Sequence, residues 1–430
     1  MEKDIVIKGA RENNLQNLDV TIPREKIVAF AGVSGSGKSS LVFDTIAITS
    51  NHQLYDIFPL HIRNRMPYQQ APKVDSVENL STAVVVDQRP FSGNIRSSVG
   101  TMTEVSPLLR LLFSRFAANK LPVSGAYSFN DPQGMCPCCH GLGSILCFDM
   151  DKMIDKEKSL NQEAIRLPGF AVDSYQWQTY ANSGLFDNDK PLKEYTEKEW
   201  DDLLHGSGFT VDIKNNTGKV WEDSYKLTYE GLLDRMERLH LKKAGNNPGK
   251  TTQKIVKEFT TQKVCPACHG KRLKEEALVS TFLGYSIWEM GQMEVSDLLQ
   301  VFQSYDGRPG RELVDKISNG LQDIVHMGLG YLNLNRPSNT LSGGETQRLK
   351  IVRHLRSSLI GMTYIFDEPS VGLHPKDIDR LNKLMIRLKN QGNTVLLVEH
   401  DKNVLQIADE VIEMGPGAGK TGGRLFFREP

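Results

Sequence analysis

The sequence lacks any apolar run of the length that crosses a membrane, and its first residues, MEKDIVIKGA, lack the apolar core of a secretion signal. A membrane helix needs about 20 consecutive apolar residues, and a signal peptide needs a shorter apolar stretch after a basic start. We therefore expect a cytoplasmic protein with no membrane partner. The formal net charge is zero, so a nucleic-acid site would have to be a local basic patch.

Cysteine is scarce, yet three of the six cysteines fall in one short stretch, GMCPCCHGLG, at residues 134–143. Clustered cysteines in the reducing cytoplasm bind metal more often than they form disulfides. The stretch contains Cys136 and Cys139 in a C-P-x-C-H-G frame, and the same frame recurs with Cys265 and Cys268. Two such turns supply the four thiolates of a tetrahedral structural zinc site.

Other outcomes stay open for these residues. The four cysteines could be free buried thiols or form a disulfide, and His140 or His269 could replace one ligand. When the two frames are overlaid, Cys138 falls at the position of Ala267, so we expect it to be a bystander. Cys147 has no partner at ligand spacing, and we expect it in the core.

A glycine-rich stretch near the N-terminus has the pattern of a phosphate-binding P-loop. An apolar, strand-like run at 27–31 leads into Gly32-x-x-x-x-Gly37-Lys38-Ser39, and an apolar helix start follows. Backbone N–H groups of such a loop and the helix N-terminus bind phosphate, the lysine reaches the β- and γ-phosphates of ATP, and the serine binds Mg²⁺. The alternative is a glycine-rich turn without a ligand. The predicted phosphate-binding residues are Gly32, Ser34, Gly35, Ser36, Gly37, Lys38, Ser39 and Ser40.

Two apolar strands are predicted near the other end of the sequence, at 362–366 and 394–398, and each is followed by ionisable residues. A carboxylate at the end of a strand beside a P-loop is placed to hold Mg²⁺, and we assign this role to Asp367. The adjacent Glu368 is the expected general base for the attacking water. His400, after the second strand, is expected to contact the γ-phosphate. Alone, each of these residues is more often structural; their order along the chain strengthens the prediction.

The segment LSGGE, at 341–345, completes a set of motifs that resembles the ATP-binding cassette (ABC) ATPases. The resemblance implies that Ser342, Gly343 and Gly344 cap the γ-phosphate of an ATP bound to a partner cassette. It implies that Gln88, at the end of TAVVVDQ, joins Mg²⁺ and the attacking water. It also implies that SVGLHP, at 370–375, is a dimer-contact loop. One departure is that residues 8–22 contain no aromatic residue to stack on adenine.

About 250 residues separate Gln88 from Ser342, far more than a transporter cassette needs there. We expect an α/β fold, with a P-loop ABC-type ATPase core, a helical signature subdomain and a large, zinc-containing, α-rich insertion. The predicted domains are the first part of the ATP-binding core at 1–105, the signature subdomain with the zinc module at 106–345, with its insertion at about 150–262, and the second part of the core at 346–430.

The insertion contains helix-like stretches and a basic run. The helix-like stretches are YTEKEWDDLLHG at 195–206 and YEGLLDRMERLH at 229–240. From Lys242 to Lys274 nine residues are Lys or Arg, and only Glu258 is acidic. Such a run is most often a solvated face. Beside a zinc module it is a candidate phosphate-contacting surface, whose binding to DNA would weaken with salt.

Longer segments resemble UvrA, the A subunit of the bacterial nucleotide-excision-repair excinuclease. They are GARENNLQNLDVTIP, YSFNDPQGMCPCCHGLG, CPACHGKRLKEEAL, GLGYLNLNRPSNTLSGGETQRL and IEMGPGAGKTGG, and together they span nearly the whole chain. The resemblance implies an ATP-hydrolysing protein that binds duplex DNA and recognises damage in it. It implies ATP, Mg²⁺ and Zn²⁺ as cofactors, dimerised ATP sites and no nuclease activity of its own.

Two departures from UvrA shape the expected partners. This chain has one cassette and UvrA has two, so we expect a half or a short paralogue that homodimerises or pairs with a missing second half; a truncated chain stays open. Only about 45 residues, at 89–135, separate Gln88 from the first cysteine frame. UvrA carries the insertion that docks UvrB in this interval, and this chain has no room for it there. Docking of UvrB is therefore not implied.

Three rival functions remain at this stage. One is a UvrA-like ATPase that confers resistance to DNA-binding drugs. Another is a transporter ATPase, but that function would not explain the paired cysteine frames. The third is a zinc-stabilised DNA-binding protein with an inactive cassette, against which the intact Lys38, Asp367 and Glu368 count.

Overall fold

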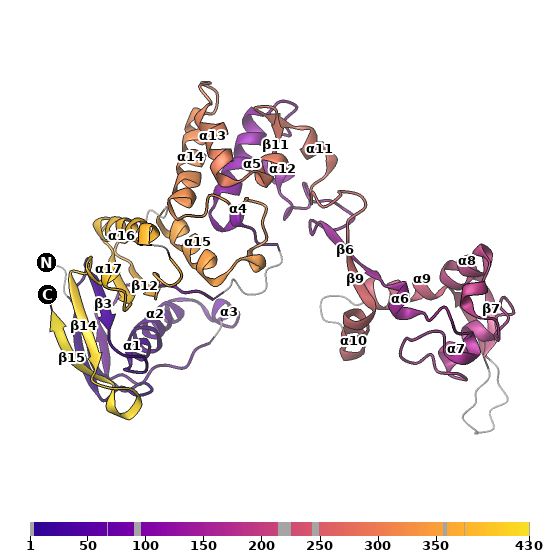
Figure 1. Ribbon diagram of the computed structural model, residues 1–430, viewed down its shortest axis with the longest axis horizontal. Helices are drawn as coiled ribbons and strands as arrows, with labels where there is room; N and C mark the ends of the chain where they lie inside the picture. The colour runs from indigo at the N-terminus through magenta and orange to yellow at the C-terminus, as the bar shows by residue number, and fades with distance from the viewer. Residues whose placement is uncertain are drawn as a thin grey trace. The chain divides into compact units, whose positions relative to one another are not determined.

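The computed structural model of the chain describes residues 4–66, 68–89, 96–213, 225–242, 249–355, 359–373 and 375–429 (Figure 1). The chain divides into two compact units. The first contains Met1–Met135 and Leu273–Pro430, and the second contains Cys136–Arg272. The second unit is thus inserted in sequence between the two halves of the first. No helix in the described part of the chain is long and apolar enough to cross a membrane.

The first unit is built on a six-stranded sheet with the order β15-β14-β3-β13-β12-β5. All its strand pairs are parallel except β14–β15. The carboxyl ends of the five parallel strands therefore lie at one edge of the sheet. The strands are β3 (Ile27–Ala31), β5 (Ala83–Val86), β12 (Thr363–Asp367), β13 (Thr394–Val398), β14 (Glu410–Gly415) and β15 (Arg424–Glu429).

Smaller sheets and several helices complete the first unit. An antiparallel sheet has the order β2-β1-β4, with β1 (Ile5–Ala10), β2 (Leu18–Ile22) and β4 (Ser76–Glu78). A short hairpin joins β10 (Thr281–Phe282) and β11 (Tyr285–Ser286). The helices of the nucleotide-binding part are α1 (Lys38–Leu41), α2 (Ile48–Ile57), α3 (Leu60–Arg63), α16 (Pro375–Asn390) and α17 (Lys402–Leu405).

Alternate residues of the central strand β3 enter two different cores. Val28 and Phe30 pack with β1, β2 and the helical segment after the P-loop. Ile27 and Ala29 pack with the core of the remaining helices. Successive side chains of a strand point to opposite faces, so this alternation is typical of a strand that is buried on both faces. The remaining helices of the unit are α4 (Val99–Met102), α5 (Val105–Phe116), α11 (Glu275–Val279), α12 (Ile287–Gln292), α13 (Val295–Gln303), α14 (Arg311–His326) and α15 (Gly343–Leu355).

The second unit has a core of its own and two small antiparallel sheets, β6–β9 and β7–β8. Its strands are β6 (Ser144–Phe148), β7 (Ser207–Ile213), β8 (Tyr225–Glu230) and β9 (Thr260–Val264). Its helices are α6 (Met150–Met153), α7 (Tyr175–Ala181), α8 (Glu197–His205), α9 (Leu232–Met236) and α10 (Lys250–Phe259). The predicted α/β class is confirmed, and this unit is rich in helices.

One expectation for the second unit is wrong in detail. The stretch 229–240 reads as helix from its start, but Tyr229 and Glu230 end strand β8, and the helix begins at Leu232. Tyr229 is 1% exposed and stacks on Phe209 of β7, with ring centroids 4.6 Å apart. A buried, non-local aromatic contact thus outweighs the local helical pattern. The predicted boundaries at 105, 150, 262 and 345 remain a proposal.

Candidate nucleotide and metal sites

The P-loop joins β3 to α1. Gly32, Gly35 and Gly37 have φ angles of 128°, 79° and 105°, a region that strains residues with a Cβ atom. A Cβ atom on Gly32 would lie 2.2 Å from the Met414 carbonyl oxygen of β14. Backbone geometry and the neighbouring strand therefore both require glycine at this position.

Lys38 and three serines at or next to the loop, Ser34, Ser39 and Ser40, line a cavity of about 460 Å³. Lys38 Nζ donates to the carbonyl oxygens of Gly32 (2.7 Å) and Val33 (3.0 Å), so the side chain spans the loop. Burial lowers the pKa of Lys38, and the Glu368 carboxylate partly opposes this shift. The lining residues are Asn14, Gly32, Val33, Ser34, Gly35, Gly37, Lys38, Ser39, Ser40, Glu368, Val398 and His400.

Ser36 is the predicted phosphate-binding residue that does not line this cavity. Its side chain is fully buried, and its hydroxyl oxygen has no hydrogen-bond partner among the described residues. Two backbone bonds fix the loop around it: Gly419 N donates to Gly35 O at 3.0 Å, and Gly423 N donates to Ser36 O at 2.8 Å. Sequence reasoning missed this support, because the donors lie near the other end of the chain.

A second cavity of about 690 Å³ brings the strand-end residues together. Ser39, Asp367, Glu368 and Gln88 all line it, with Asp87 beside them. Burial raises the pKa of Asp367, and the Glu368 and Asp87 carboxylates raise it further. A divalent cation at this point would offset that repulsion, since hard cations prefer carboxylate and hydroxyl oxygens.

Glu368 and His400 face each other across the first cavity. His400 Nδ1 lies 3.8 Å from Glu368 Oε1. Glu368 has a φ of 39°, which is unusual for a residue with a side chain and typical of functional positions. The structure therefore gathers all five predicted catalytic and magnesium residues (Ser39, Gln88, Asp367, Glu368 and His400) around two adjoining cavities.

Glu399 is a structural residue of the site that sequence reasoning passed over. It is 0% exposed, and its carboxylate accepts hydrogen bonds from the backbone N–H groups of Ser370 (3.2 Å), His400 (2.8 Å) and Asp401 (3.1 Å). It therefore ties the start of the predicted dimer-contact loop to the histidine. Of that loop, His374 and the side chain of Pro375 lie outside the described residues.

The signature residues Ser342, Gly343 and Gly344 lie at the start of α15. Ser342 N donates to Glu345 Oε2 at 2.7 Å, and Glu345 N donates to Ser342 Oγ at 3.2 Å, a reciprocal helix cap. Burial by itself would raise the pKa of Glu345, but hydrogen bonds from Tyr331 and Ser342 outweigh it and lower the pKa. None of the three signature residues lines either cavity described above.

Helix α15 also holds the segments that follow β5 and β12. Lys350 Nζ donates to Asp87 Oδ1 (2.7 Å) and to the carbonyl oxygen of Arg89 (2.9 Å). Gln347 Nε2 donates to the carbonyl oxygens of Val86 (3.2 Å) and Asp367 (2.7 Å). These two residues were not predicted, yet they connect the signature helix directly to the loop that carries Gln88.

The four paired cysteines form one buried cluster in the second unit. Their sulfur atoms all lie within 4.8 Å of one another; Cys136 and Cys265 are 3.9 Å apart, and Cys139 and Cys268 are 3.6 Å apart. Four sulfurs at about 2.3 Å from a tetrahedral zinc ion would be about 3.8 Å apart. The cluster therefore fits a tetrahedral metal ion. The separations exclude S–S bonds of about 2.05 Å.

The two cysteine frames adopt the same turn. His140 and His269 have φ angles of 49° and 48°, and both histidines are exposed and outside the cluster. Burial would raise the pKa of the Cys265 thiol, but backbone N–H groups of Cys268 and Ala267 lower it to about 6. Burial raises the pKa of Cys268 to about 12 and also raises that of Cys139. The metal-free cluster therefore does not favour four thiolates at once, and a bound cation would favour them.

The two remaining cysteines take no part in the cluster. Cys138 is exposed and Cys147 is partly buried, and neither is a member of the group. The Cys138 thiol nevertheless hydrogen-bonds to that of Cys265, so its bystander role stays a prediction. Cys147 lies at the edge of the core rather than within it.

The basic run does not form one surface. Lys250, Lys254 and Lys257 are exposed on one face of α10, and Ile255 is buried on the other. Arg272 is half-buried, and its Nε donates to Gly141 O at 2.8 Å, so it supports a cysteine turn. Lys274 belongs to the first unit, while Lys243 and the side chain of Lys242 lie outside the described residues.

Comparison with known proteins identifies the family. The family described as the UvrA DNA-binding domain matches residues 149–247. The UvrABC system protein A of Paucimonas lemoignei is 32% identical over 461 residues, covering 100% of this chain and 66% of that protein. The crystal structure of UvrA2 from Deinococcus radiodurans is 31% identical, with a TM-score of 0.82, and the match covers 99% of this chain and 56% of that one. The chain belongs to the UvrA family.

Membership confirms the predicted architecture of a P-loop ABC-type core with a helical signature subdomain and an insertion, and the insertion carries a cluster of four cysteines with the spacing of a metal site. This UvrA-family chain spans less than two thirds of the length of these relatives. The match to the UvrABC system protein A of Halalkalibacterium halodurans is 28% identical, runs over 574 positions and covers 98% of this chain and 59% of that protein. That span exceeds the 430 residues of this chain, so the relative carries internal segments that this chain lacks.

Proposed function

We propose that this protein hydrolyses ATP, binds duplex DNA and recognises damage in it, as part of an excision-repair process of the UvrA type. One observation carries the proposal. Lys38, Asp367, Glu368 and Gln88 surround two adjoining cavities at one sheet edge, in a chain that also carries a UvrA DNA-binding domain. An ATP site and a DNA-binding insertion in one chain would let the nucleotide state control DNA binding.

Each residue of the site has a proposed role. The backbone N–H groups of 32–37 and the Lys38 ammonium bind phosphate oxygens, and the Ser39 hydroxyl and the Asp367 carboxylate hold Mg²⁺. Mg²⁺ neutralises charge on the phosphates. Glu368 accepts the proton of the attacking water, and Gln88 and His400 orient that water and the γ-phosphate.

The second half of each ATP site comes from another cassette in this proposal. Ser342, Gly343 and Gly344 lie outside the cavities of their own chain, so they are available to cap an ATP bound elsewhere. We propose a homodimer or a pair with a second cassette. The proposal includes no membrane partner, no nuclease activity and no docking of UvrB, and the cytoplasmic location stays a prediction.

Zinc is the proposed ion of the cysteine cluster. Four buried thiolates at tetrahedral spacing suit Zn²⁺, and a closed set of four ligands is typical of structural rather than catalytic zinc. The ion would join the two turns that begin and end the insertion, since Cys136 and Cys139 lie near one end of it and Cys265 and Cys268 near the other.

A binding experiment tests the proposed DNA target. The affinity for a duplex with one bulky lesion is compared with that for the same intact duplex, with and without ATP, over a series of salt concentrations. We expect tighter binding to the lesion in at least one nucleotide state. Equal affinity at every salt concentration and nucleotide state would rule out damage recognition, and ATP hydrolysis measured in parallel reports on the ATPase separately.

A further inference from the structure

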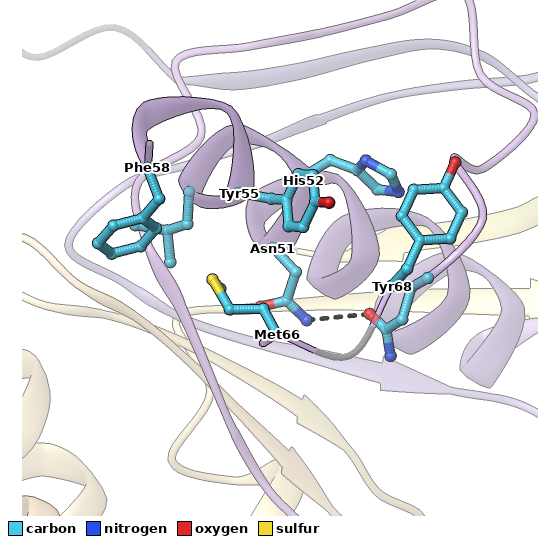
Figure 2. A pocket seen from close by; sticks show the side chains of 8 residues that line it. Asn51, His52, Tyr55, Phe58, Met66 and Tyr68 are labelled. Atoms are coloured by element: carbon cyan, nitrogen blue, oxygen red, sulfur yellow. Dashed lines mark hydrogen bonds between the residues drawn. The ribbon is translucent and has the colours of Figure 1, made fainter. Parts of the chain in front are cut away.

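A pocket lined by aromatic and amide side chains lies beside the ATP site, at the carboxyl end of α2 (Figure 2). Its volume is about 210 Å³, and none of its lining residues carries a fixed charge. A cavity of about 150 Å³ is large enough for one benzene ring, so this pocket has room for a slightly larger flat ring. Figure 2 shows Phe58 and Tyr68 at opposite ends of the pocket, with Tyr55 between them.

Three of the aromatic rings are arranged edge to face. The Tyr68 ring lies 6.0 Å from His52 at 85°, and 6.1 Å from Tyr55 at 70°. Tyr68 is nevertheless 72% exposed, and it belongs to an apolar patch in which Ile57 and Leu60 are 77% and 72% exposed. Large exposed apolar side chains gathered in one short stretch mark a binding site more often than isolated exposed residues do.

An arginine lies beside the pocket. The Arg63 guanidinium lies 5.4 Å from the centre of the Tyr55 ring and donates to the backbone carbonyl of Phe58. Asp56 lies 3.7 Å from the Arg63 guanidinium and partly offsets its charge, while residues 57–72 add Arg65 and no further Asp or Glu. Aromatic rings interleaved with cations are the usual platform for an unpaired base and its phosphates.

A hydrogen bond links this pocket to the ATP site. Asn51 Nδ2 donates to Gln69 Oε1 at 3.2 Å, shown by the dashed line in Figure 2. Both residues also line the larger cavity that contains Gln88 and Glu368. The two amides therefore form a wall shared by the aromatic pocket and the cavity proposed for Mg²⁺ and the attacking water.

We propose that this pocket binds one flat aromatic heterocycle of nucleobase size, and that the Asn51–Gln69 wall makes ATP hydrolysis sensitive to its occupancy. The ring could be an unpaired base of a DNA strand or a free heterocycle, and the Arg63 guanidinium beside the Tyr55 ring favours a base that carries phosphates. The coupling to hydrolysis rests on the proposed function. The pocket would give the protein a second DNA contact, in the unit that holds the ATP site.

Fluorescence of pyrrolocytosine, which falls on stacking, tests the binding. The probe is used as the free nucleoside and as one unpaired base in a DNA duplex, with the ATP site filled by a non-hydrolysable ATP analogue. We expect quenching by the wild type, and Tyr55→Ala or Tyr68→Ala to weaken binding roughly 5- to 100-fold, the range for loss of one base–aromatic stack. Tyr55→Phe and Tyr68→Phe retain the rings and should bind normally.

The control variant is Tyr285→Ala, which removes an exposed ring elsewhere in the first unit. Thermal unfolding checks that each variant is folded. If the duplex probe binds at least tenfold more tightly than the free nucleoside, the ligand of the pocket is an unpaired base of a DNA strand. If the two probes bind with equal affinity, the ligand is a free heterocycle. The proposal is overturned if neither form is quenched, or if the tyrosine-to-alanine variants quench as the wild type does.

A second measurement tests the coupling. The duplex probe should change the wild-type rate of ATP hydrolysis, and Asn51→Ala should bind the probe while losing at least half of that change, judged against its own basal rate. An unchanged response in Asn51→Ala would overturn the coupling. Probe binding without any ATP hydrolysis would instead contradict the proposed ATPase and leave the pocket standing.

Discussion

Glu368 lies at the point where β12 ends, in a left-handed backbone conformation and within 3.8 Å of His400. If it accepts the proton of the attacking water, Glu368→Gln should lower kcat for ATP about 100-fold or more, because positioned general bases contribute 10²–10⁴-fold. ATP should still bind, since the phosphate contacts remain. Single-turnover hydrolysis and ATP binding measured on the same sample check this.

The matched control for Glu368→Gln is Glu276→Gln, on an exposed face of α11. It should hydrolyse ATP as the wild type does. A normal rate in Glu368→Gln would assign the base to another residue.

The half-buried carboxyl of Asp367 has a pH-dependent effect on stability. Its folded pKa is raised by burial and by Glu368 and Asp87, so the ionised carboxylate destabilises the metal-free fold above that pKa. Asp367→Asn should therefore raise the melting temperature at pH 7 without Mg²⁺. The difference should shrink as the pH falls through the folded pKa toward the ordinary Asp pKa of about 3.9, and below that pH the carboxyl is protonated in both states.

Calorimetry between pH 4 and 8, with and without MgATP, measures this effect. The same variant should lose the stabilisation that MgATP gives the wild type. Asp201→Asn, at an exposed position of α8, serves as the control. A melting temperature of Asp367→Asn below that of the wild type at pH 7 without Mg²⁺ would show that Asp367 stabilises the metal-free fold by another contact.

Single residues of the site could be predicted where a short motif defines their chemistry. Lys38, Asp367 and the paired cysteines are of this kind, because each belongs to a local pattern at fixed spacing. Asn14 is the opposite case: its side chain donates to Gly35 O at 3.0 Å and to Gly419 O at 3.3 Å. No local pattern links three positions so far apart in the sequence, so only the folded chain identifies this residue.

At the scale of the element, α10 presents the lysines best placed for DNA. Lys250, Lys254 and Lys257 share its exposed face. If all three contact phosphates, changing them to Gln should reduce the slope of log K against log salt by up to about 2.7, because each phosphate contact contributes about 0.9. Fluorescence anisotropy on a duplex over a salt series measures the slope.

A triple change of Lys120, Lys316 and Lys383 to Gln, all in the first unit, is matched in charge and should leave the slope unaltered. An equal loss in both triple variants would indicate a long-range charge effect, and no loss in the α10 variant would exclude this face from the interface.

Elements with strong local signals were predicted closely, and those set by tertiary contacts were not. The strands at 27–31 and 394–398 have the predicted bounds, because continuous apolar runs flanked by turn residues define buried parallel strands. The β7–β8 sheet was missed, since its pairing depends on the Phe209–Tyr229 stack. The π-helical segment Val42–Ala47, which widens the helix after the P-loop, also has no signal in the sequence.

At the scale of the molecule, the second unit should depend on its metal more than the first does. Cys265 is fully buried within the cluster, and zinc in comparable peptides contributes an apparent 10–16 kcal/mol, about as much as a domain's whole stability. Cys265→Ser should reduce zinc from about one ion per chain to below half. It should also increase hydrogen exchange over 136–272 while the sheet of the first unit stays protected.

Metal analysis by mass spectrometry and hydrogen exchange check this. Cys138→Ser, which changes an exposed cysteine outside the cluster, should keep both the zinc and the protection. Full protection of 136–272 in the metal-free Cys265→Ser variant would show that the core around Tyr180 and Tyr229 folds without the ion.

The chain enters and leaves the second unit at neighbouring points. Cys136 N donates to Arg272 O at 2.9 Å, and Lys274 N donates to Gly134 O at 2.9 Å. Two ends that are already hydrogen-bonded to each other can be rejoined by a short turn, so evolution could gain, lose or exchange the whole insertion without rebuilding the nucleotide-binding part. Family members that differ in what they bind could thus arise by replacing one self-contained segment, while the ATP-driven part stays common to all.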